Sequence, residues 1–178
     1  MGFFSKDKIT RNQLVENLSA MVFHSISDDS LETYKILLKD MRESEAIDEK
    51  QKREILILEM LAITRSVQKI FTNQNEAKFL LDKLYSKVYD GISRAEEERL
   101  EFEEFVRERY RIYYEILSSQ SQFMAFTFGK QFADYFLNKD VKGTGLALIN
   151  TATDIFMLNV EETEKFIRGL LSKYELEK

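Results

Sequence analysis

The segment between residues 48 and 72 constrains the fold most, because its apolar side chains go round every side of a helix. A helix with one apolar stripe lies at a surface, whereas a helix that is apolar all round is buried. We therefore expect a buried central helix at about 48–72, with the other helices packed around it. Its apolar residues are Ile55, Leu56, Ile57, Leu58, Met60, Leu61, Ile63, Val67, Ile70 and Phe71.

Signals for helix starts recur along the chain. In a capping box, a short polar residue precedes the helix and Glu or Gln follows three residues later, so that two backbone donors are satisfied. The pairs of this form are Thr10 with Gln13, Asp29 with Glu32, Asp48 with Gln51, Ser93 with Glu96, and Asn159 with Glu162. The chain also has no proline and only six glycines in 178 residues, so it contains few residues that break helices.

These patterns predict an all-α fold, a single compact bundle of seven or eight helices. The expected helices cover about 10–25, 29–43, 48–72, 76–90, 94–118, 122–137, 145–158 and 160–175. Residues 1–9 are expected to form a flexible N-terminal tail. Because the joints between the helices are short, residues 10–178 are expected to form one domain.

The composition excludes several classes of function. The absence of cysteine excludes disulfides and thiolate metal sites, and the single histidine, His24, argues against a di-iron bundle. We expect no metal site and no cofactor. A net charge of −5 argues against nucleic acid as a partner. The most apolar stretch, 123–137, is too short to span a bilayer, so we expect no stable membrane insertion and a cytoplasmic location.

Two charged residues fall on apolar helix faces. Arg109 lies on the apolar arc of the 102–117 segment beside Phe105 and Tyr113, and Glu59 lies on the central helix. A buried charge needs a partner, so we expect Glu59 and Arg109 to meet, or each to pair with Arg65, Asp134 or a tyrosine hydroxyl.

This pattern has two interpretations. The first is a structural ion pair that fixes the register of two helices. The second is a ligand site in which Arg109 and Glu59 floor an aromatic-lined pocket for an anionic or amphipathic small molecule. The candidate ligand-binding residues are then Arg109, Glu59, Tyr113 and Phe105. Catalysis by Glu59 is a third, weaker hypothesis.

The aromatic segment 123–137 also has two interpretations. It is either a helix in the core, or an interface for self-association or for another protein, where aromatic residues supply most of the binding energy. The candidate interface residues are Phe126, Phe128, Phe132 and Phe136.

The leading functional hypothesis is a non-enzymatic interaction or assembly protein that self-associates through this aromatic surface. The alternative is the small-molecule binder described above. We see no serine or cysteine context that would make His24 part of a catalytic triad, so an enzyme is the least favoured class.

Overall fold

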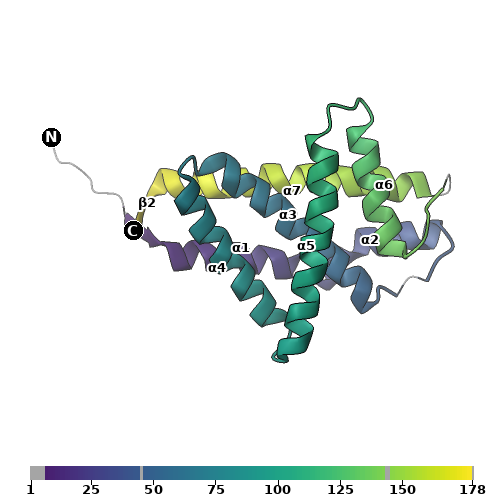
Figure 1. Ribbon diagram of the computed structural model, residues 1–178, viewed down its shortest axis with the longest axis horizontal. Coiled ribbons are helices and arrows are strands. Elements are labelled where there is room, and N and C mark those ends of the chain that lie inside the picture. The colour runs from purple at the N-terminus through teal and green to yellow at the C-terminus, as the bar shows by residue number, and fades with distance from the viewer. Residues whose placement is uncertain (1–6, 45, 143–144, 178) are drawn as a thin grey trace.

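The computed structural model describes residues 7–44, 46–142 and 145–177, and it confirms the all-α class (Figure 1). Two short strands accompany the helices. The helices are α1 (Arg11–His24), α2 (Asp28–Asp40), α3 (Glu49–Ile70), α4 (Gln74–Ile92), α5 (Glu96–Ser118), α6 (Met124–Leu137) and α7 (Leu146–Lys173), and the strands are β1 (Asp7–Thr10) and β2 (Tyr174–Glu177).

The predicted central helix is confirmed as α3. Every residue from Glu54 to Thr64 is buried, so α3 has no exposed face over these three turns. Helices α1, α4, α5, α6 and α7 all contact it. In Figure 1, α3 lies behind α5 and between α7 and the α1–α2 segment. The apolar side chains on every side of α3 thus pack against neighbouring helices on every side. This arrangement stabilises a buried helix.

The structure confirms two of the predicted capping boxes. The Thr10 hydroxyl accepts from the Gln13 amide at 3.1 Å, and the Asp48 carboxylate accepts from the Gln51 amide at 2.8 Å. In both cases the glutamine side chain accepts from the N-cap amide in return. The other three predictions were wrong: α2 follows Ser27, α5 follows Ala95, and Asn159 lies inside α7.

The number of separate helical units is smaller than expected. The segments 145–158 and 160–175, predicted as two helices, form the single continuous helix α7. Helices α1 and α2 are separated only by residues 25–27, so they join into one bent segment. The described part of the chain therefore packs as six separate helical units, not seven or eight.

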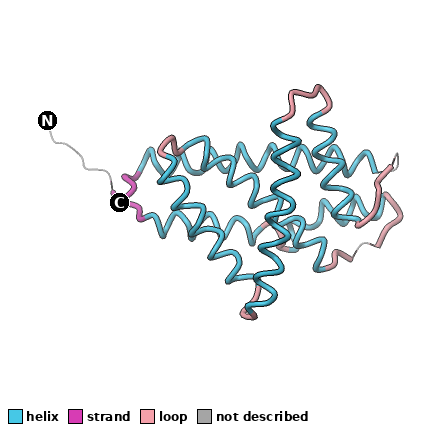
Figure 2. Tube along the Cα trace, in the orientation of Figure 1, coloured by secondary structure: helices cyan, strands magenta, loops and turns pink. Residues whose placement is uncertain are grey.

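The ends of the described chain meet in a short parallel sheet. Residues 7–9, predicted to be part of a flexible tail, belong to β1, and Ile9 is buried. Strand β1 pairs with β2 in the register Asp7 with Tyr174 and Thr10 with Glu177. Figure 2 shows both strands side by side at one end of the helices. Residues 1–6 of the predicted tail lie outside the described residues.

Candidate functional site

Arg109 is held by a glutamate that the sequence analysis did not consider. Its Nε donates to both carboxylate oxygens of Glu54 at 3.0 and 3.1 Å, and its Nη2 donates to Oε1 at 2.8 Å. Both side chains are buried. The guanidinium also lies 3.4 Å from the centre of the Tyr135 ring and 5.5 Å from that of Phe105. Arg109 is therefore fully engaged by α3, α5 and α6.

This ion pair is part of the packing between helices. Burial raises the pKa of the Glu54 carboxyl, while the hydrogen bonds and charge of Arg109 oppose that rise. Tyr113 is buried beside it, with its ring centre 5.0 Å from that of Phe128. Arg109, Phe105 and Tyr113, predicted to bind a ligand, thus form a structural cluster with Glu54. We call these four residues the Arg109 cluster.

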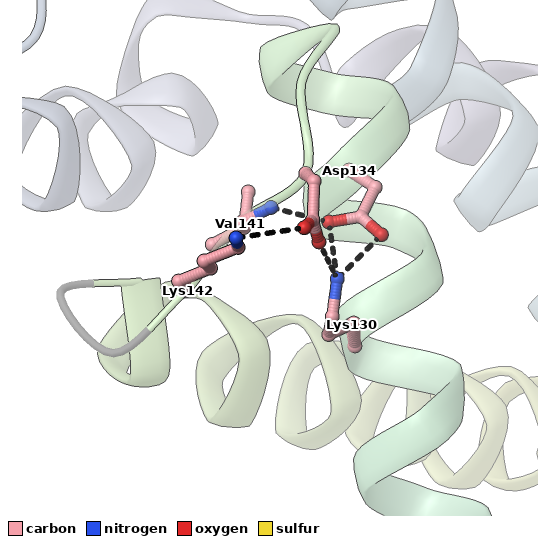
Figure 3. A network of polar contacts seen from close by, with 5 residues as sticks. Lys130, Asp134, Val141 and Lys142 are labelled. Atoms are coloured by element: carbon pink, nitrogen blue, oxygen red, sulfur yellow. Dashed lines mark hydrogen bonds and ion pairs between the residues drawn. The ribbon is translucent and has the colours of Figure 1, made fainter.

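Asp134, another candidate partner for the buried charges, belongs to a different network (Figure 3). Its carboxylate accepts from Lys130 at 2.7 and 2.9 Å and from the Val141 amide at 2.7 Å. Lys130 also donates to Asp140 at 2.7 Å. Figure 3 shows Lys130 reaching from α6 toward the carboxylates beside the chain that follows the helix. These contacts hold the segment that follows α6 against the helix. Asp134 is therefore not the partner of Arg109 or of Glu59.

Glu59 lies on another side of α3. It stands five positions after Glu54, which places the two side chains about 140° apart around the helix axis. The side chain of Glu59 is buried, and the Asn159 amide of α7 donates to its Oε2. Burial raises the pKa of the Glu59 carboxyl to about 7. No lysine or arginine within the described residues forms an ion pair with it. Glu59 and Arg109 do not meet, so the expected pocket floored by both is not formed.

Glu59 instead lines a pocket of about 850 Å³ between four helices. Each helix contributes residues at helical spacing, so one face of each helix points into the same space. The lining residues are Asn17, Ala20, Met21, His24 and Ser25 from α1 and its C-cap, Ser30, Thr33 and Tyr34 from α2, Ile55, Leu58 and Glu59 from α3, and Ile155, Asn159, Glu162 and Phe166 from α7.

Tyr34 is the second buried polar residue of this pocket. Its ring packs against Phe136 and Phe132, with ring centres 5.4 and 6.3 Å apart, so the core fixes its orientation. Its hydroxyl is buried, and within the described structure it has no hydrogen-bond partner. Buried hydroxyls are normally satisfied, and one that is not needs an explanation. Burial, and next the charge of Glu59, raise the pKa of this hydroxyl, and both residues line the pocket.

The pocket has an acidic character. Glu59 and Glu162 contribute two carboxyls, and the described residues that line it include no lysine or arginine. His24, at the C-terminal end of α1, also lines it. Most of the other wall is apolar, from Met21, Ile55, Leu58, Ile155 and Phe166. An apolar wall with a few convergent polar groups is the usual composition of a small-molecule site.

A second pocket differs in its polar groups. It has a volume of about 640 Å³ and lies between α3, α4 and α5. Three of its hydroxyls form hydrogen bonds with one another. The Thr64 hydroxyl oxygen lies 2.6 Å from that of Tyr85 and 3.2 Å from that of Tyr110. Tyr114 donates to Gln68 at 3.3 Å. Because these groups already have hydrogen-bond partners, they are less available to a ligand than the polar groups of the pocket at Glu59.

The aromatic helix α6 lies mainly in the core. Three of the four predicted interface residues, Phe128, Phe132 and Phe136, are buried and face other helices. Phe128 packs on Phe156 of α7, with ring centres 4.6 Å apart. Only Phe126 of the predicted set is exposed, at 45% of its surface. At the other three positions the predicted interface does not lie on the surface of the described chain, because this face of α6 packs against α3, α5 and α7. No helix among the described residues is long and apolar enough to cross a membrane.

Tyr34 was not among the residues predicted for a site, and Asn159 was predicted to begin a helix. Tyr34 stands at helical spacing between Leu31 and Leu38, which already indicates an inward-facing side chain. Asn159 resembled an N-cap residue, but its side-chain amide donates a hydrogen bond to Glu59. The sequence gives no local sign that these two side chains converge, because they come from helices more than a hundred residues apart.

Searches for related proteins add no information on this site. Comparisons of the chain with family models, curated proteins and solved structures found no match. The described residues also contain no group of three His, Asp or Glu side chains placed to hold a metal ion.

Proposed function

We propose that this protein binds a small molecule in the pocket between α1, α2, α3 and α7. The observation that carries the proposal is the pair of buried polar groups at its wall. The Tyr34 hydroxyl has no partner within the described structure, and the Glu59 carboxyl has only Asn159. Two such groups are costly to bury when they are not fully paired, and a ligand that pairs with them would offset that cost.

The pocket is consistent with a ligand that is amphipathic. Its volume of about 850 Å³ falls within the usual range for small-molecule sites. The predicted anionic ligand depended on Arg109, which Glu54 neutralises. Two carboxyls in the wall disfavour an anion further. The amphipathic part of the hypothesis is retained, with Glu59 and Tyr34 as its polar contacts.

Binding of Nile red, a neutral apolar dye, tests this proposal. Ala20 lies at the pocket and is exposed, so Ala20→Trp narrows the pocket without disturbing the core. We expect the full chain to enhance the dye's fluorescence in a saturable way, and Ala20→Trp to weaken binding at least tenfold. Ala147→Trp is the matched control, since Ala147 is exposed on α7 and outside this pocket. Equal binding by both variants and the wild type would contradict the proposal.

We retain self-association, the leading hypothesis from the sequence, as a second candidate. Its interface would be smaller than the predicted one. Phe123 and Phe126 are exposed at the start of α6, and Met157 is exposed on α7. Thr153 donates to the Ala125 carbonyl at 3.0 Å, so these turns of α6 and α7 are adjacent. This patch suits a second copy of the chain. Sedimentation equilibrium should then show a dimer that Phe126→Asp dissociates and that Ile36→Asp, at an exposed residue of α2, leaves intact.

A further inference from the structure

Glu59 is a buried carboxyl that lacks a counter-ion. Its side chain receives one described hydrogen bond, from Asn159 to Oε2. A carboxylate accepts about four hydrogen bonds when it is fully satisfied, so most of its capacity is unused. Buried ionised carboxylates are normally paired with a cation. Glu54, on the same helix, has such a cation in Arg109, whereas Glu59 has none within the described residues.

The Tyr34 hydroxyl is an independent sign of a missing polar group. It is buried and has no partner in the described structure, and its ring is held by Phe132 and Phe136. Tyr34 lines the same pocket as Glu59. A group that donates a hydrogen bond to Glu59 and another to Tyr34 would satisfy both residues together.

The charge of the pocket selects among ligand classes. An anionic ligand would meet Glu59 and Glu162 with no lysine or arginine among the described lining residues. A neutral alcohol would satisfy a hydrogen bond but leave the Glu59 charge uncompensated. A protonated amine supplies both a positive charge and several N–H donors. The apolar wall formed by Met21, Ile155 and Phe166 offers contact to a hydrocarbon body.

We infer that the ligand of this pocket is an amphipathic amine, whose protonated nitrogen is bound by the Glu59 carboxylate and the Tyr34 hydroxyl. This inference rests on the proposed small-molecule function and specifies its chemistry. Asn159 positions the carboxylate from α7, and the apolar residues of α1, α3 and α7 contact the hydrocarbon part of the ligand. No covalent step is involved.

Binding should depend on pH in a defined direction. The groups that face Glu59 in the pocket are Tyr34 from α2, His24 from α1, and Asn159 and Glu162 from α7. Because burial holds the pKa of Glu59 near 7, the carboxyl is mostly protonated at pH 6 and mostly ionised at pH 8. An ammonium binds the ionised form, so its affinity should fall about tenfold from pH 8 to pH 6, with uptake of the ligand releasing a proton.

A set of probes of equal length tests the inference by isothermal titration calorimetry on the full chain. The probes are n-octylamine, n-octanol and n-octanoate, at pH 8 and pH 6. We expect n-octylamine to bind at least tenfold more tightly than n-octanol at pH 8, and n-octanoate to bind most weakly. Glu59→Gln should abolish the preference for the amine, and Tyr34→Phe should weaken amine binding severalfold. Glu161→Gln removes an adjacent exposed charge outside the pocket and should change nothing.

The possible outcomes separate the two proposals. If n-octanol or n-octanoate binds as tightly as the amine, or if Glu59→Gln keeps the amine preference, the inference is overturned while Nile red binding still supports the pocket. If neither Nile red nor any of the three probes binds, both proposals fail. The comparison of probes on the wild-type chain remains decisive even if a variant does not fold, which circular dichroism reports.

Discussion

Glu54 and Glu59 are two buried glutamates of one helix with different surroundings. Glu54 faces α5 and receives the Arg109 guanidinium, whereas Glu59 faces α2 and α7 and receives one neutral amide. Burial raises the pKa of both carboxyls, but only Glu54 has a cation that opposes the rise. At the scale of single residues, the first is a structural pair and the second is a candidate contact for a ligand.

The raised pKa of Glu59 predicts how stability depends on pH. The folded protein holds this proton more tightly than the unfolded chain does. Its contribution to stability is therefore complete below about pH 4 and is lost as the pH rises through about 7. The loss amounts to about 3 kcal/mol at most, from about 1.4 kcal/mol per pKa unit.

Replacing Glu59 with glutamine should remove that loss, because the amide carries no charge at any pH. We expect the free energy of unfolding in urea to be similar for Glu59→Gln and wild type at pH 5, and higher for the variant at pH 8.5. Circular dichroism at a series of pH values measures both curves. Glu161→Gln, at an exposed position, serves as the control. Parallel curves for Glu59→Gln and wild type would show that Glu59 ionises as an exposed glutamate does.

Arg109 should matter for stability and not for the pocket. Arg109→Met leaves Glu54 buried without its cation, which should reduce the free energy of unfolding by about 3–5 kcal/mol. The double variant Arg109→Met with Glu54→Gln should recover part of that loss, because no uncompensated charge remains. Urea denaturation measures both. A double variant whose loss equals the sum of the two single losses would argue against a direct pair.

At the scale of elements, the close contact between α6 and α7 depends on a small residue. A Cβ atom at Gly129 would lie 2.1 Å from the Ile149 carbonyl oxygen and 2.5 Å from Thr153 Oγ1. The first of these atoms belongs to the backbone of α7 and cannot move aside as a side chain can. The same close approach brings Phe128 against Phe156.

Gly129 and Gly169 form a matched pair of helix glycines. Gly129→Ala should destabilise the protein by about 1–3 kcal/mol, because α6 and α7 must separate. A Cβ at Gly169 would meet nothing within 4 Å, so Gly169→Ala should stabilise the protein by about 0.5–1 kcal/mol through its better helix propensity. Thermal unfolding followed by circular dichroism measures both. Equal effects at the two positions would mean that the helices tolerate the extra methyl group.

At the scale of the whole molecule, one core connects the elements. Its buried residues come from all seven helices, with α3 in the middle, and the β1–β2 pairing joins the two ends of the described chain. The single domain predicted for residues 10–178 stays a prediction. A shared core favours cooperative unfolding, because no helix can leave without exposing the apolar faces of its neighbours.

Unfolding should therefore occur in one transition. We expect the urea curve followed by far-ultraviolet circular dichroism to coincide with the curve followed by tyrosine fluorescence, since the chain has eight tyrosines and no tryptophan. The buried tyrosines Tyr34 and Tyr113 report on the core, and the circular dichroism signal reports on all helices. Two separated midpoints would show instead that the chain divides into units of different stability.

The helical class, the central helix and the burial of certain charges could be predicted from the sequence alone. The periodicity of apolar residues around α3 indicated that it lies inside, and Thr10 and Asp48 marked two helix starts correctly. The same periodicity placed Glu59 and Arg109 on inward faces, and both are buried. These features follow from the spacing of residues along one helix, and this spacing can be read directly from the sequence.

The neighbours that these inward faces contact could not be predicted in the same way, because they depend on how the helices pack together. Helical spacing gives the direction of a side chain around its own axis, but not which helix lies in that direction. Both glutamates are on α3, but α5 packs on the side of α3 that carries Glu54. Arg109 of α5 therefore pairs with Glu54 and not with Glu59. Glu59 meets Asn159 and the pocket beside Tyr34 because α7 and α2 cover its side. Contacts between residues a hundred positions apart depend on how all the helices pack together, and no short stretch of sequence contains that information.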